Sequence, residues 1–143
     1  MAHRPPPEPL PPRLRPQLEN ARHALLAVHR ALLQAERLEY EGEHGRIEGN
    51  SEFMRLVLVQ PRFAWLHPLL ALVVEIDELL AGNAPADDDL VTTLVARARE
   101  CLRPDEHGDA FQRRYFELLQ DAPAVVIAHG EAMKRLRAPA PGA

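Results

Sequence analysis

Residues 69–80 read LLALVVEIDELL and form the most apolar run of the chain. Leucine, valine and isoleucine recur in it at steps of three and four, which places them on one face of an α-helix. Further apolar side chains widen that face, and a helix that is apolar on most sides is usually surrounded by other helices. The run therefore predicts a central helix over about 68–81.

The same helical spacing recurs on both sides of this run. A long helix is predicted over about 16–41, ended by Gly42, and a shorter one over 51–60, capped by Asn50 or Ser51. Two prolines make 61–67 a compact turn or short helical piece. Three more helices are expected over about 87–102, 109–120 and 123–137, opened by Asp87, Asp109 and Asp121. No segment shows the alternation of apolar and polar residues that is typical of a β-strand. We therefore expect an all-α, single-domain helical bundle of about five to six helices.

Proline sets the limits of this domain. Seven of the 14 prolines fall within the first 16 residues, and proline lacks the backbone N–H that a helix requires. We therefore expect a disordered Pro-rich arm over 1–15, the bundle over 16–137 and a disordered tail over 138–143.

Charge and cysteine content restrict the classes of function. The net charge of -4 argues against nucleic acid as a partner, since phosphate binding favours an excess of positive charge. The single Cys101 excludes an intramolecular disulfide, and we expect it to be a small buried residue rather than a reactive thiol.

The early residues contain no apolar stretch fit for a secretory signal, and acids interrupt the longest apolar run. We expect a cytoplasmic protein that does not enter membranes.

Polar residues on the apolar faces are the first candidates for a site. Arg22, His29 and Glu36 are spaced by seven and follow the leucines of the first helix, while Asp77 borders the apolar face of the central one. One hypothesis is a small-ligand pocket beside Arg22, His29 and Asp77. The alternative is structural pairing, with Arg55, Arg62 and His67 as the bases nearest to Asp77 in sequence.

Metal binding has one candidate pair. Glu41 and His44 have the Glu-x-x-His spacing of di-iron helical bundles. Such a site needs a second copy of the motif, and the chain has none. We therefore predict no metal and no cofactor.

The segment RFAWLH, residues 62–67, is a candidate for catalysis. Arginine, an apolar residue and then histidine five positions after the arginine resemble the short motif of the HEPN ribonucleases. The resemblance implies a small all-helical domain in which Arg62 and His67 act on RNA phosphate. Trp65 in the same segment has two interpretations of its own, an aromatic anchor in the core or a contact for a partner.

The chain lacks a glycine-rich phosphate loop, a G-x-S-x-G elbow and a Cys-x-x-Cys pair. The leading hypothesis is a non-enzymatic helical protein that acts through protein–protein contacts or self-association, most simply as a homodimer, because broad apolar helix faces favour association. Two alternatives stay open: a small-ligand-binding bundle, and a HEPN-like RNA-cleaving enzyme that uses Arg62 and His67.

Overall fold

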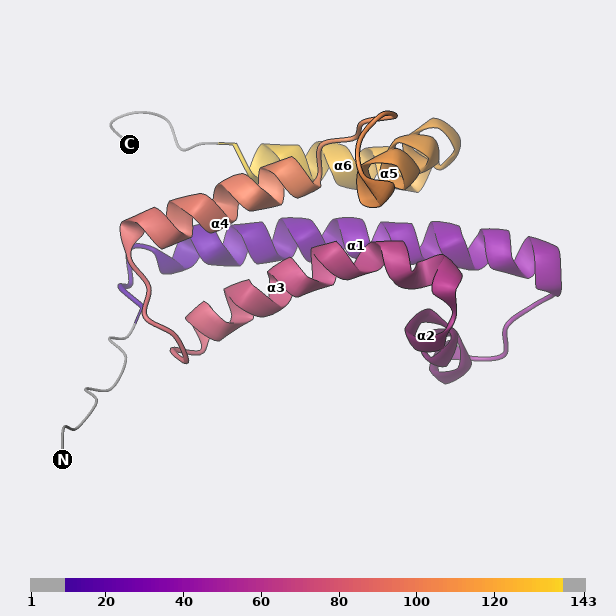
Figure 1. The fold of residues 1–143 in the computed structure, drawn as a ribbon, viewed down its shortest axis with the longest axis horizontal. Helices are drawn as coiled ribbons and strands as arrows, with labels where there is room; N and C mark the ends of the chain where they lie inside the picture. The colour runs from indigo at the N-terminus through magenta and orange to yellow at the C-terminus, as the bar shows by residue number, and fades with distance from the viewer. Residues whose placement is uncertain (1–9, 138–143) are drawn as a thin grey trace.

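Six α-helices and one 3₁₀-helix build the part of the chain that the computed structural model describes, residues 10–137 (Figure 1). They are α1 (Arg15–His44), α2 (Asn50–Val59), η1 (Pro61–Leu66), α3 (His67–Leu80), α4 (Asp88–Cys101), α5 (Ala110–Asp121) and α6 (Pro123–Arg135). No strand occurs within residues 10–137. The prediction of an all-α bundle of five to six helices is confirmed.

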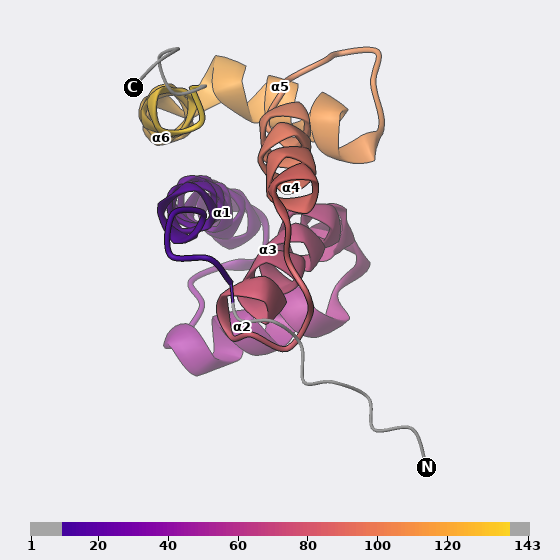
Figure 2. The ribbon, with the colours of Figure 1, turned by 90° about the vertical axis from the view of Figure 1, so that its left-hand side faces the viewer.

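The central helix is α1, which corrects the expectation that residues 68–81 would be central. Helices α3, α4, α5 and α6 all pack against α1, as Figures 1 and 2 show from two sides. α1 has 30 residues and is about 45 Å long, enough to offer surface to four neighbours. α3 has 14 residues and leaves Val74 exposed on its outer side. Length, rather than apolar content, decides which helix the others surround.

The domain begins earlier than predicted. Leu10 and Leu14 are both buried in the core, so residues 10–15 belong to the bundle and not to an extended arm. Leu10, Leu14 and Leu18 are spaced by four, so they extend the buried side of α1 backward. The remainder of the predicted arm, 1–9, and the predicted tail, 138–143, lie outside the described residues.

Helix ends differ from the prediction where glycine is involved. α1 continues through Gly42 to His44 and stops at Gly45, whose φ of 89° favours glycine. Gly49, with a φ of 84°, precedes α2, and no side chain caps that helix. Asn50, one of the two predicted caps, instead accepts a hydrogen bond from Arg37 at 3.0 Å.

Aspartate caps α4 as predicted and also caps α5, but the predicted cap of α6 is wrong. Asp87 accepts from the backbone N–H of Leu90 at 2.8 Å, and Asp109 accepts from that of Gln112 at 2.8 Å. Asp121 is the last residue of α5, and α6 follows after Ala122 alone. Pro123 opens α6 and has no backbone N–H that would need a cap.

The chain bends sharply between α2 and α3. η1 confirms the expected short helical piece at residues 61–66.

Within residues 10–137 no single helix has the length and apolar content to span a membrane. Only α2 and the segment Pro61–Leu80, taken together across an 85° bend, meet those two criteria.

Candidate functional site

Arg22 and Asp77 lie together, as the sequence proposed for a polar site. The Arg22 Nε donates to Asp77 Oδ1 at 2.6 Å, and both side chains are partly exposed. They line a shallow depression of about 420 Å³ at the surface. The bases nearest to Asp77 in sequence are therefore not its partner, because α3 runs antiparallel to α1 and places Asp77 opposite Arg22.

His29, the third member of the proposed pocket, is not in this depression. It is buried on the inner side of α1, and its Nε2 has no hydrogen-bond partner within the described residues. Burial lowers the pKa of His29, because the imidazolium would be poorly solvated there. The side chain thus behaves as a neutral core residue.

Glu36, the last member of the polar file, is buried and belongs to a different cluster. Arg114 of α5 donates to it from Nε at 3.1 Å and also from Nη2. The same guanidinium contacts Glu39, and it contacts Glu117 at 2.9 Å. Burial alone would lower the pKa of Arg114, but its hydrogen bonds to these carboxylates outweigh that effect and raise it. The three polar residues spaced by seven on α1, Arg22, His29 and Glu36, therefore lie in three separate environments.

A partly buried polar pair joins α5 to α6. The Tyr115 hydroxyl lies 2.6 Å from His129 Nδ1. Burial raises the pKa of Tyr115 and lowers that of His129, so the hydroxyl and the imidazole are both neutral near pH 7. Nothing in the sequence around Tyr115 or His129 predicts this contact. No local pattern marks two residues on successive helices as partners.

Arg62 and His67, the residues of the HEPN-like motif, have different surroundings. The Arg62 Nη1 lies 2.7 Å from Glu43, and its guanidinium lies 5.2 Å from the centre of the Tyr40 ring. His67 is exposed at the start of α3, and its side chain makes no hydrogen bond or ion pair with the described residues. The structure therefore gives Arg62 a role in holding η1 against the end of α1. RNA cleavage stays an untested prediction.

Glu41 and His44 also have structural partners. The Glu41 Oε2 accepts from the backbone N–H of Ile47 at 2.8 Å, and the His44 ring lies 4.4 Å from that of Tyr40. Across residues 10–137 no group of three histidine, cysteine, aspartate or glutamate side chains is placed to hold a metal ion.

Trp65 of η1 is half-buried and packs against α5. Its ring centre lies 5.3 Å from that of Phe111. The indole Nε1 is buried and has no hydrogen-bond partner in the described part of the chain. These contacts favour the interpretation of Trp65 as a core anchor.

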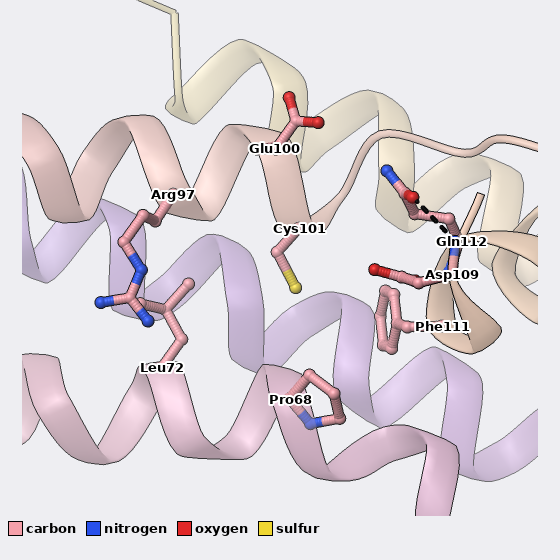
Figure 3. Close-up of a pocket in the computed structure, with 8 residues that line it drawn as sticks. All are labelled: Pro68, Leu72, Arg97, Glu100, Cys101, Asp109, Phe111 and Gln112. Atoms are coloured by element: carbon pink, nitrogen blue, oxygen red, sulfur yellow. Dashed lines mark hydrogen bonds between the residues drawn. The ribbon is translucent and has the colours of Figure 1, made fainter.

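Cys101 borders a cavity of about 320 Å³ between α3, α4 and α5 (Figure 3). Burial raises the pKa of its thiol to about 11, with a smaller contribution from Asp109, so the nucleophilic thiolate is scarce near pH 7. The polar groups around it already have partners. Arg97 binds Glu75 at 2.8 Å, and Asp109 and Gln112 bind each other at the start of α5.

The outer side of α2 carries a group of exposed apolar side chains. Met54, Leu58 and Val59 are 46%, 76% and 64% exposed, and we call these three residues the α2 patch. Phe53 and Val57, on the opposite side, are buried.

Residues 10–137 thus form an all-α helical bundle. No family model, curated protein or solved structure matches this chain.

Proposed function

We propose that this protein acts by self-association, with the α2 patch as the contact between two copies. The supporting observation is that three large apolar side chains gather on one side of a 10-residue helix. An isolated helix of this length is marginal in water, so α2 depends on packing. Burying its outer side as well would stabilise both the helix and the dimer.

Charge around the patch suits a second copy of the same chain. Glu52 and Arg55 flank it and neutralise each other, with 3.0 Å between the Arg55 Nη2 and Glu52 Oε1. In a two-fold interface each patch meets itself, so a net charge there would repel its counterpart. Met54 adds an unbranched side chain that can adapt to a facing surface.

The size of the patch predicts a weak dimer. Six apolar side chains, three from each copy, would supply on the order of 10 kcal/mol when buried. Association costs about 4–15 kcal/mol in lost translational and rotational freedom. The balance leaves at most about 6 kcal/mol, so we expect a dissociation constant of tens of micromolar or weaker.

Sedimentation velocity over a range of protein concentrations tests this proposal. The wild-type protein should shift from 16.1 kDa toward twice that mass as concentration rises. Leu58→Lys should abolish the shift. Leu38→Lys is the matched control, because Leu38 is an equally large, 61% exposed leucine on another helix. A wild-type protein that stays monomeric at the highest concentrations, or equal effects of the two variants, would overturn the proposal.

A further inference from the structure

A cleft at the opposite end of the bundle from α2 has a distinct chemistry. It measures about 400 Å³ and is formed by the first turns of α1, the middle of α4 and the end of α6. Figure 2 looks onto this end and shows α4 and α6 both beside α1. None of the residues that line the cleft is acidic, whereas three are arginines: Arg99, Arg135 and Arg137.

The arginines are available to a ligand. The Arg99 Nε donates to the Leu136 carbonyl at 2.6 Å, which fixes the guanidinium and leaves its two terminal nitrogens without a partner among residues 10–137. Arg135 and Arg137 are exposed and form no ion pair with any described carboxylate. Two acids on the same helices, Asp88 and Glu131, have other partners, Arg13 and Lys134.

The helix dipoles account for only part of this cluster. Basic residues in a last helical turn complement the partial negative charge there, which explains Lys134 and Arg135. Arg99 likewise lies in the last turn of its own helix, α4, whereas Arg137 lies beyond the end of α6. Three guanidinium groups still outweigh the two helix-end charges of about one half each. The cleft is therefore positive in a chain whose net charge is -4.

The other lining residues indicate the kind of anion. Gln17, Asn20 and Thr92 supply neutral hydrogen-bonding groups, while Val95 and Leu136 supply apolar contact. Guanidinium groups match phosphate oxygens in pairs, and such charge-assisted bonds are stronger than neutral ones. The volume lies in the range of about 300–1,000 Å³ typical of small-molecule sites, larger than a single phosphate requires.

We infer that this cleft binds a small soluble molecule with two phosphate groups on a short organic skeleton. The arginines hold the phosphates, the amide and hydroxyl side chains bind polar groups of the skeleton, and Val95 and Leu136 contact its carbon atoms. This site is separate from the α2 patch and does not depend on self-association.

Calorimetric titration with pyrophosphate at low ionic strength tests the inference, since pyrophosphate carries the required charge without a skeleton. Binding should saturate at one site per chain and weaken as salt is added. The double variant Arg135→Gln/Arg137→Gln should bind at least about tenfold more weakly. It leaves the Arg99–Leu136 hydrogen bond in place, and its circular dichroism and melting curve should match those of the wild type.

The control variant is Arg46→Gln/Arg113→Gln. It removes the same charge from two exposed arginines outside the cleft, so its affinity should stay within about twofold of the wild type. Absence of saturable binding, or equal weakening in both double variants, would overturn the inference. Binding to vesicles of phosphatidylcholine and phosphatidylinositol bisphosphate without binding to pyrophosphate would overturn it too, in favour of a lipid headgroup.

Discussion

Arg114 on α5 binds Glu36 on α1 through two of its nitrogens, and the carboxylate of Glu36 is almost wholly removed from water. The two residues are 78 positions apart in the chain. This contact joins α5 to the central helix at a point where a charge without a partner would be costly. The structure therefore depends on Arg114 more than its position on a short surface helix would indicate.

Replacing Arg114 with methionine should lower the free energy of unfolding by about 3 kcal/mol, because it leaves Glu36 buried without its partner. Urea denaturation gives the value. Arg113→Met is the matched control, since Arg113 is exposed on the same helix; its effect should be within about 0.5 kcal/mol. Equal losses in the two variants would show that Glu36 is not held as described.

Replacing Tyr115 with phenylalanine should lower stability by about 1 kcal/mol, since it removes the hydrogen bond to His129 without changing the packing of the ring. Tyr40→Phe serves as the control, because the Tyr40 hydroxyl makes no hydrogen bond within the described residues. Thermal denaturation followed by circular dichroism compares the two. A Tyr115→Phe variant as stable as Tyr40→Phe would contradict the pairing.

Stability should fall as the pH drops below about 6.5. Burial lowers the pKa of His29 and of His129 in the folded protein, whereas in the unfolded chain both titrate near 6.5. Between the folded and unfolded pKa values the unfolded chain binds more protons, so acid favours unfolding. His29→Leu should reduce this pH dependence and raise stability, because it also removes an unpaired buried nitrogen.

Urea titrations at several pH values measure the slope. His67→Gln is the control, since His67 is exposed at the start of α3. Unchanged pH dependence in His29→Leu would show that His29 is not buried in a neutral form.

Cys101 should react slowly with thiol reagents in the folded protein. A pKa of about 11 in place of 9.0 reduces the thiolate fraction near pH 8 by about a hundredfold. Absorbance during reaction with a disulfide reagent should show slow modification in buffer and fast modification in urea. Similar rates in the two conditions would contradict the burial of the thiol.

Periodicity in the sequence predicted the helices well because it reports which side of each helix is apolar. It does not report which helix lies opposite. Arg22 and Asp77 were therefore placed beside one proposed pocket, but the ion pair between them was not predicted. Glu36 was recognised as a polar residue on an apolar face, whereas Arg114 was missed because its partner lies on a distant helix.

Local sequence patterns predicted correctly only those interactions that form between residues close together in the chain. Asp87 caps α4 as expected, since the acceptor and the N–H lie three residues apart. Leu10 and Leu14 were assigned to an arm because proline surrounds them. Their burial depends on contacts that only the assembled bundle provides.

The connection of α2 to the rest of the protein has a consequence for its dynamics. α2 packs chiefly on η1, whereas α1 contacts α3, α4, α5 and α6 and ties them into one cooperative unit. Backbone amides in α2 should therefore exchange with deuterium through a small local opening, and those in the middle of α1 only through global unfolding. Shielding of α2 amides at high protein concentration would then report on association without any label.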